Sequence, residues 1–211
     1  MPMMRARLLL ADDHSLILEG LRRVIEPKYE VVGMVTDGRA LVEAALRLRP
    51  DLIILDITMP LLNGIDAARE IKKRLPEVKL LFVTMHASPT YLQAALDVGA
   101  TGYVLKSSAR EEILTAVEKV LKGELFVTPS VCPKSLEEGA DPARVATSLR
   151  LSPREREILQ LVAEGNSTKE VAHVLNISQK TVAFHKDNIK RKLGLGTTAE
   201  LTKYALDEGL V

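Results

Sequence analysis

The stretch Asp51-Leu52-Ile53-Ile54-Leu55-Asp56-Ile57-Thr58-Met59-Pro60 gives the clearest indication of how the first part of the chain folds. Its four consecutive apolar residues, 52–55, are too few for a helix and are typical of a strand covered on both faces. Asp56 follows this strand directly, and Pro60 then favours a loop. Because open α/β sheets bind ligands at the carboxyl ends of their strands, the sequence predicts that Asp56 is a nucleophile or a metal ligand.

Further apolar runs of the same kind alternate with helical patterns through residues 4–122, which we interpret as one domain. In the last helical pattern, apolar residues recur at helical spacing at Ile113, Ala116, Val117, Val120 and Leu121. Five βα units of this length predict a doubly wound, five-stranded parallel sheet with helices on both faces. The predicted strands are Leu8–Ala11, Val31–Val35, Leu52–Leu55, Leu80–Val83 and Tyr103–Leu105.

The composition narrows the class of protein. The chain has 211 residues, 46% of them hydrophobic, which is enough for one large core or two modest ones. Its single cysteine, Cys132, excludes an internal disulfide framework and a multi-cysteine metal site. No apolar run approaches the length of a membrane span, and the run 8–11 is too short for a signal peptide. We therefore expect a soluble, cytoplasmic protein.

Residues 123–148 show no sustained periodicity. Three prolines, Gly139 and an acidic cluster lie in this stretch. We interpret it as a linker, with a short helix near 143–148. The linker separates the α/β domain from residues 149–211, in which every apolar pattern is helical.

Residues 149–211 predict an all-α domain of four helices. The predicted N-caps are Ser152, Ser167, Ser178 and Thr197, and Glu155, Glu170 and Glu200 complete capping boxes at three of them. A short helix, a tight turn at Asn176 and a longer helix over 178–193 predict a helix-turn-helix. The longer helix carries Lys180, Lys186, Lys190, Arg191 and Lys192 against Asp187 alone, an excess that would attract a phosphate backbone.

Residues 4–122 resemble the receiver domain of bacterial two-component response regulators, which has a flavodoxin-like fold. The matching residues follow four predicted strands, at Asp12-Asp13, Asp56, Thr84 and Lys106. In a doubly wound sheet, all of these would converge on one edge. Singly, each has a simpler explanation, since Asp13 could cap a helix and Lys106 could be solvated. Their joint placement favours the receiver interpretation.

The resemblance implies that Asp56 accepts a phosphoryl group with the help of Mg²⁺. Asp13, Asp56 and the backbone carbonyl of Thr58 would hold the ion, with Asp12 acting more indirectly, through water. Oxygen ligands of this kind suit Mg²⁺. The positive charge of Lys106 would pair with the phosphoryl oxygens, because transfer onto a carboxylate requires relief of negative charge.

The resemblance also implies a switch formed by Thr84 and Tyr103. The Thr84 hydroxyl would bind the phosphoryl group, and the Tyr103 ring would swing inward when Thr84 moves, although Tyr103 could equally be a core residue. An alternative is a haloacid-dehalogenase-like phosphatase, which also uses a strand-end Asp, a Thr or Ser, a Lys and Mg²⁺. That family has a second Asp two residues after its nucleophile, where this chain has Thr58, and a cap domain without a counterpart here.

Residues 149–211 resemble the LuxR-type helix-turn-helix domain, so the whole chain resembles the NarL/FixJ class of response regulators. The helix over 178–193 would be about 24 Å long, sufficient for a major groove. The predicted phosphate contacts are Lys180, Thr181, Lys190 and Arg191, and the predicted base-reading face is Ala183, Phe184 and Asp187. Familiar members often carry Lys at positions 183 and 187. The alternatives are a helical bundle for protein contact and an RNA-binding domain.

As a whole, the resemblance implies a transcription regulator and not a metabolic enzyme. A sensor histidine kinase or a small phosphodonor would phosphorylate Asp56, and the protein would catalyse only its own phosphorylation and dephosphorylation. Phosphorylation would release the carboxyl-terminal domain to form a homodimer through the helix beginning near Thr197. Such a dimer would bind a two-fold symmetric site on double-stranded DNA.

Overall fold

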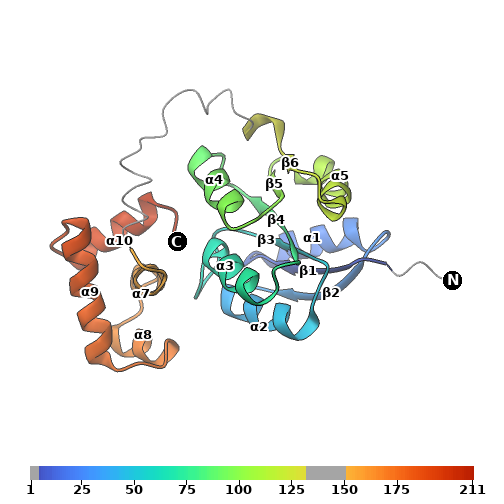
Figure 1. Ribbon diagram of the computed structural model, residues 1–211. Coiled ribbons are helices and arrows are strands. Elements are labelled where there is room, and N and C mark those ends of the chain that lie inside the picture. The colour runs from blue at the N-terminus through green and yellow to red at the C-terminus, as the bar shows by residue number, and fades with distance from the viewer. Residues whose placement is uncertain (1–4, 132–150) are drawn as a thin grey trace. The chain divides into compact units, whose positions relative to one another are not determined.

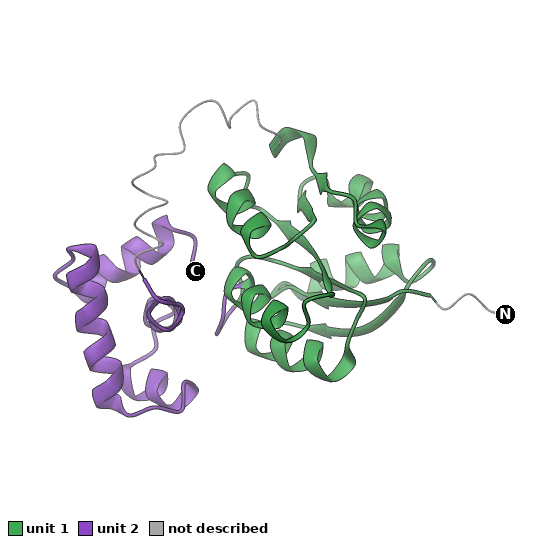
Figure 2. Cartoon of the chain, viewed as in Figure 1, with its two compact units in different colours: residues 1–59, 64–139 green, residues 60–63, 140–211 purple. Residues whose placement is uncertain are grey.

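The computed structural model describes residues 5–131 and 151–211. The chain divides into two compact units, residues 1–59 with 64–139 and residues 60–63 with 140–211 (Figure 2). Cys132 and the short helix predicted near 143–148 lie outside the described residues.

The first unit is a parallel sheet with helices on both faces, as predicted. The strand order is β2-β1-β3-β4-β5-β6, and Figure 1 shows α1 and α5 on one face with α2, α3 and α4 on the other. The strands are β1 Arg7–Ala11, β2 Glu30–Val35, β3 Leu52–Leu55, β4 Lys79–Thr84, β5 Gly102–Leu105 and β6 Phe126–Val127. The helices are α1 Ser15–Ile25, α2 Gly38–Leu48, α3 Gly64–Arg74, α4 Pro89–Asp97 and α5 Ala109–Lys122.

Strand β3 lies in the centre of the sheet and is buried on both sides. Leu52 and Ile54 pack into the core formed with α1 and α5. Ile53 and Leu55, whose side chains point to the opposite face, are fully buried as well. Burial of one such side chain contributes about 1.5–3 kcal/mol, so the unbroken apolar run both forms the strand and fixes it at the sheet centre.

The sheet has a sixth strand, β6, which lies within residues 123–148, the stretch predicted to be a linker. Strand β6 pairs in parallel with β5, and Pro129–Val131 then form a 3-10 turn. The prediction of a linker from residue 123 is therefore wrong for 126–131. Phe126, Val127 and Thr128 are strand-forming residues, but their run is too short to reveal a strand without the neighbouring edge of β5.

The second unit contains the four predicted helices, α7 Pro153–Ala163, α8 Thr168–Val174, α9 Gln179–Leu193 and α10 Thr198–Asp207. All three predicted capping boxes are formed, and Ser178 caps α9 by accepting from the Thr181 N–H. Asn176 takes the predicted left-handed conformation, with φ 50°. The helices enclose an aliphatic core that includes Ile158, Leu161, Val171, Val182, Ile189, Leu201 and Ala205.

Across the described parts of both units, no helix combines the length and the apolar character needed to cross a membrane.

Candidate functional site

The first site lies at the carboxyl ends of neighbouring strands and is built around Lys106. The predicted convergence of Asp12, Asp56 and Lys106, which follow β1, β3 and β5, is seen directly. The Lys106 ammonium donates to Asp56 Oδ2 at 2.6 Å and lies 2.7 Å from Asp12 Oδ2. The exposed fractions of the side chains of Lys106, Asp12 and Asp56 are only 6%, 2% and 5%. Two buried carboxylates therefore share one buried cation.

Backbone hydrogen bonds between the strands hold these residues in place. The Asp56 N–H donates to the Ala11 carbonyl, one residue before Asp12, and the Lys106 N–H donates to the Thr84 carbonyl. Asp56 Oδ1 also accepts from the Ile57 N–H. Consequently the sheet register fixes the backbone positions from which the three charged side chains extend toward one another.

The charge of Lys106 is secured by its partners. Burial alone would lower the pKa of Lys106, but hydrogen bonds and charge attraction from Asp12 and Asp56 outweigh it, and the pKa is raised. The three groups carry a formal charge of −1 together. The neighbouring Asp13 carboxylate, which is 30% exposed, adds a further negative charge. Such an oxygen-rich, net negative site suits a hard divalent cation.

Asp12, Asp13 and His14 form an acidic group whose potential ligand atoms lie within 4.8 Å of one another. His14 Nδ1 is 2.7 Å from Asp13 Oδ1 and 3.3 Å from Asp12 Oδ1. The N-cap of α1 is His14, without a side-chain cap, so the alternative of Asp13 as a helix cap is not realised. The carboxylates fit Mg²⁺, whereas a histidine nitrogen is not a typical ligand of that ion.

His86, which sequence reasoning missed, connects Thr58, Thr84 and Tyr103. Its Nε2 is 2.9 Å from Thr58 Oγ1, its N–H donates to Thr84 Oγ1 at 3.3 Å, and its carbonyl accepts from the Tyr103 hydroxyl at 2.7 Å. Burial lowers the pKa of His86. The negative charge of Asp56 opposes this change, and the positive charge of Lys106 adds to it. Its place two residues after the strand-end Thr84 was the signal available in the sequence.

Thr84 and Tyr103 are both buried, and the Tyr103 ring lies inward in this structure. The exposed fraction is 0% for Thr84 and 1% for Tyr103. Burial raises the pKa of the Tyr103 phenol, which keeps the hydroxyl protonated as the donor to His86. The pair predicted as a switch thus belongs to one hydrogen-bonded network with His86.

Gly64, at the start of α3, is a second position that sequence reasoning missed. A Cβ at this residue would lie 1.9 Å from the Asp56 carbonyl oxygen, far inside contact distance. The Gly64 N–H donates to the Ile57 carbonyl at 2.7 Å. The backbone of the loop after β3 therefore closes tightly behind Asp56, and only glycine permits that approach.

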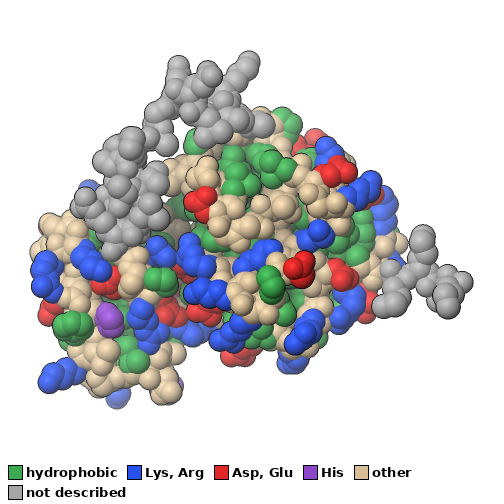
Figure 3. Space-filling model, in the orientation of Figure 1, with side chains coloured by type: hydrophobic (Ala, Val, Ile, Leu, Met, Phe, Trp, Pro, Cys, Tyr) green, Lys and Arg blue, Asp and Glu red, His purple; other side chains and the backbone are tan. Residues whose placement is uncertain are grey.

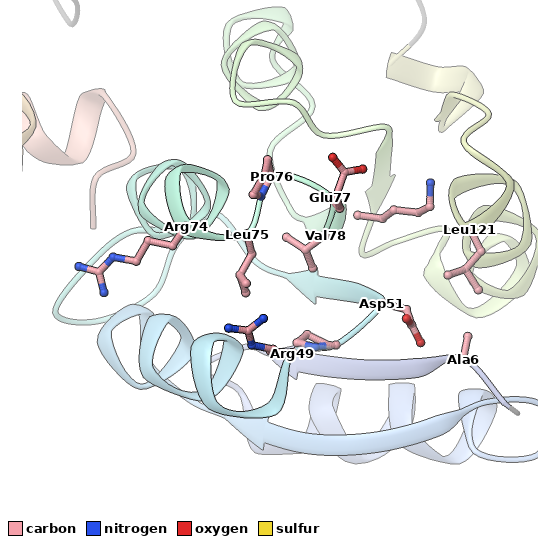
Figure 4. A pocket seen from close by; sticks show the side chains of 11 residues that line it. Ala6, Arg49, Asp51, Arg74, Leu75, Pro76, Glu77, Val78 and Leu121 are labelled. Atoms are coloured by element: carbon pink, nitrogen blue, oxygen red, sulfur yellow. The ribbon is translucent and has the colours of Figure 1, made fainter.

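A cavity of about 650 Å³ lies at the opposite edge of the sheet, at the amino ends of β1, β3 and β4 (Figure 4). Its lining includes Asp51, Val78 and Lys79 and none of the predicted site residues. The position of this cavity does not match the chemistry assembled around Lys106, and we assign the site from the charged cluster.

In the second unit, α9 displays most of the residues predicted to contact nucleic acid. Lys180, Ala183, Phe184, Asp187 and Arg191 are exposed, whereas Thr181 and Lys190 are half-buried. The Thr181 hydroxyl lies 2.8 Å from Ser178 Oγ, so it takes part in the helix cap. In Figure 3, Lys and Arg side chains lie over the part of the second unit that carries α9 in Figure 1.

Two further features distinguish α9. The exposed fraction of the Phe184 side chain is 62%, which is unusual for a large apolar residue. Lys192 Nζ donates to the buried Glu155 carboxylate at 2.7 Å, so this member of the basic excess anchors α9 to α7. Burial opposes ionisation of Glu155, but hydrogen bonds from Lys192 and Ser152 outweigh it and lower the pKa.

Comparisons with known proteins agree with this architecture. Residues 8–118 match the family model of the response regulator receiver domain, and residues 149–205 match that of the bacterial regulatory proteins of the luxR family. The transcriptional regulatory protein MctR of Rhizobium johnstonii is 38% identical, with 98% of this chain and 96% of MctR covered. The oxygen regulatory protein NreC of Staphylococcus aureus is 35% identical, with 97% and 99% covered.

Solved structures extend the similarity to the whole chain. RcsB from Salmonella enterica serovar Typhimurium, bound to promoter P1flhDC in the presence of the phosphomimetic BeF₃⁻, has a TM-score of 0.59 at 33% identity, with 95% of this chain and 97% of that chain covered. An RcsB–DNA complex has the same TM-score and identity, with 96% and 98% covered. These matches favour the receiver interpretation over the phosphatase alternative. The chain belongs to the NarL/FixJ class of two-component response regulators, with a receiver domain followed by a luxR-family helix-turn-helix domain.

Proposed function

We propose that Asp56 accepts a phosphoryl group from a sensor histidine kinase and that the phosphorylated protein binds double-stranded DNA as a homodimer to regulate transcription. The observation that carries the proposal is the buried Lys106 held between Asp12 and Asp56. A fixed cation beside a strand-end carboxylate is the arrangement that phosphoryl transfer onto that carboxylate requires. The protein would act in the cytoplasm, and its catalysis would be limited to its own phosphorylation and dephosphorylation.

In the proposed reaction, one Asp56 oxygen attacks the phosphorus of the donor. The bond between phosphorus and the donor nitrogen, or the donor oxygen of a small phosphodonor, breaks as the new P–O bond forms, and the donor leaves with its electron pair. Lys106 lies where it can offset the negative charge on the phosphoryl oxygens. Its ammonium is already charged and lies 2.6 Å from the carboxylate that would react.

We propose that Asp12, Asp13, Asp56 and the Thr58 carbonyl hold Mg²⁺. When bound, the ion would neutralise charge on the carboxylates and the incoming phosphoryl group. The support is the acidic group at the start of α1 together with the buried Asp56 carboxylate, which is hydrogen-bonded through one oxygen to the Ile57 N–H and through the other to Lys106. His14 remains outside our ligand set.

Thr84 and Tyr103 would report the phosphoryl group to the rest of the receiver domain. The Thr84 hydroxyl accepts from the His86 N–H, so its movement toward a phosphoryl oxygen would disturb the residue whose carbonyl anchors Tyr103. Two arrangements of this network would differ in free energy according to the state of Asp56.

For DNA binding we propose that Lys180, Thr181, Lys190 and Arg191 contact phosphates, and that Ala183, Phe184 and Asp187 face the bases. Phe184 could contact a thymine methyl group, and Asp187 could accept from cytosine N4. Support comes from the exposure of Phe184 and from the DNA-bound state of RcsB in the solved structures. Dimerisation would use α10, on which Leu206 is 58% exposed.

We further propose a receiver domain over residues 4–131, which extends the predicted range 4–122, and a DNA-binding domain over residues 149–211, with the linker revised to begin after Val131. Strand β6 and the following turn complete the receiver sheet, so they belong with the first domain.

The phosphoryl-acceptor assignment is tested with two variants of the same strand. Asp56→Asn removes the carboxylate after β3, whereas Asp51→Asn removes the exposed carboxylate before it. We expect wild type and Asp51→Asn to take up hydroxylamine-sensitive label from radiolabelled acetyl phosphate with Mg²⁺, and Asp56→Asn to take up none. Equal labelling of Asp56→Asn would refute the assignment.

The DNA assignment is tested by the salt dependence of binding to duplex DNA and to RNA of the same sequence. Each lost phosphate contact should reduce the slope of log K against log [salt] by about 1. We expect this for Lys180→Ala on α9, and no change for Lys169→Ala on α8. Binding that prefers RNA, or that does not depend on salt, would contradict a duplex DNA interface.

A further inference from the structure

Thr128, directly after β6, is a buried polar residue outside the proposed phosphorylation site. Its exposed fraction is 1%. The hydroxyl accepts from the Leu105 N–H at 3.1 Å and donates to Glu112 Oε2 on α5 at 2.6 Å. The Thr128 N–H donates to the Tyr103 carbonyl at 2.9 Å. Thr128 therefore joins the end of β5 to α5 and to the last strand of the sheet.

The Thr128 hydroxyl takes the place of one rung in the sheet ladder. Strand β6 pairs with Gly102 and Tyr103 of β5. The Leu105 N–H, which is the next β5 amide directed toward β6, donates to the Thr128 hydroxyl in place of a backbone carbonyl. The hydroxyl fills this place. An unpaired buried N–H would be costly, which gives the contact a structural value that an exposed threonine lacks.

Of the two β5 residues that Thr128 holds, one is a proposed functional residue and the other directly precedes one. Tyr103 itself is bound through its carbonyl, and Leu105 directly precedes Lys106. Successive amides of β5 point to opposite sides, so that the Leu105 N–H is bound by Thr128 and the Lys106 N–H by the Thr84 carbonyl. Thr128 and Thr84 thus hold the end of β5 from its two edges.

We propose that Thr128 is a positioning residue that couples Lys106 and Tyr103 to the chain leading from the receiver domain to the helix-turn-helix domain. This proposal rests on the proposed function. A phosphoryl group on Asp56 offers Lys106 new oxygen partners, and any resulting shift of the β5 end acts on the Leu105 N–H. The Thr128 hydroxyl accepts from the Leu105 N–H and donates its single proton to Glu112. If the Leu105 N–H moves, Thr128 must therefore move with it or lose the hydrogen bond from that amide.

The coupling is tested in the full chain with Thr128→Val, which keeps the shape but lacks the hydroxyl, and Thr128→Ser, which retains it. The probe is beryllium fluoride with Mg²⁺. The two readouts are the increase in Tm on adding the probe, which reports its binding at Asp56, and the ratio of DNA affinities with and without it. The DNA is a fragment selected from a random pool by the wild-type protein in the presence of the probe.

We expect Thr128→Val to retain the increase in Tm while its affinity ratio falls by at least about fivefold, the lower end of typical allosteric coupling. Thr128→Ser should restore the wild-type ratio. A purely structural role would lower the Tm without changing the ratio, and an unchanged ratio in Thr128→Val would overturn the coupling. A wild-type protein whose Tm does not respond to the probe would instead overturn the proposed function.

A second measurement does not require the valine variant to fold. In wild type, the probe should change hydrogen-exchange protection at the amides of both Leu105 and Thr128. Protection that stays the same at both amides, while the Tm rises, would overturn the coupling.

Discussion

Replacing Lys106 by methionine should produce a large, pH-dependent loss of stability. The substitution keeps most of the side-chain volume but removes the ammonium group that lies 2.7 Å from Asp12 Oδ2 and 2.6 Å from Asp56 Oδ2. Removal of one partner from a buried ion pair costs about 3–5 kcal/mol, because the remaining charge stays buried without compensation. Here two carboxylates would remain, so we expect a cost in that range, a large part of a typical domain's stability.

The pH dependence of the stability of Lys106→Met follows from the direction in which the substitution shifts the pKa of the remaining carboxyl groups. Without Lys106, Asp12 and Asp56 repel each other, which raises the pKa of at least one carboxyl in the folded variant. A group with a raised folded pKa contributes stability at low pH that is lost as the pH rises through that pKa. The stability deficit of Lys106→Met should therefore shrink from about pH 8 to about pH 5. In wild type, the raised pKa of Lys106 places its own loss of stability in the alkaline range, above the usual lysine value.

The assay is urea unfolding of the full chain followed by circular dichroism, with hydrogen exchange at β3 and β5 amides to assign the transition to the first unit. Lys28→Met is the matched control, because Lys28 makes an exposed ion pair with Glu118 at 3.0 Å. It should change stability little at any of these pH values. A loss below about 1 kcal/mol for Lys106→Met, equal at both pH values, would refute the electrostatic account of the site.

Three further predictions concern other parts of the structure. Gly64→Ala should lower stability and slow labelling of Asp56, because the new Cβ would lie 1.9 Å from the Asp56 carbonyl oxygen. The control is Gly20→Ala, on an exposed helix face where a Cβ would have no atom within 4 Å. In urea unfolding, this control should be neutral or stabilising by about 0.5–1 kcal/mol. Burial raises the pKa of Tyr204 to about 12, so stability should fall as the pH rises above the usual tyrosine value. In an ultraviolet absorbance titration, Tyr204→Phe should lack one phenol that titrates late in the wild type. A titration identical to that of the wild type would contradict the burial effect. Thr197→Ala should cost about 1 kcal/mol by removing the cap of α10, whereas Thr197→Ser should not, as measured by urea unfolding of both variants.

Local patterns in the sequence were enough to place most helices and strands. Burial on both faces requires an unbroken apolar run such as 52–55, and helix ends require particular residues such as Ser152 with Glu155, so these elements leave short-range signals. Strand β6 left too short a signal, because its pairing depends on the edge of β5, more than twenty residues earlier.

The candidate site divides in the same way. The pattern of apolar runs was sufficient to predict that Asp12, Asp56, Thr84 and Lys106 lie at strand ends, and hence that they converge on one edge of the sheet. Three features became visible only in three dimensions: Lys106 bridges two buried carboxylates, His86 connects Thr58 to Tyr103, and Gly64 packs closely against Asp56. The physical reason is range: periodicity and capping act over a few neighbouring residues, whereas distances between charges and hydrogen-bond partners are set by register between strands far apart in the chain.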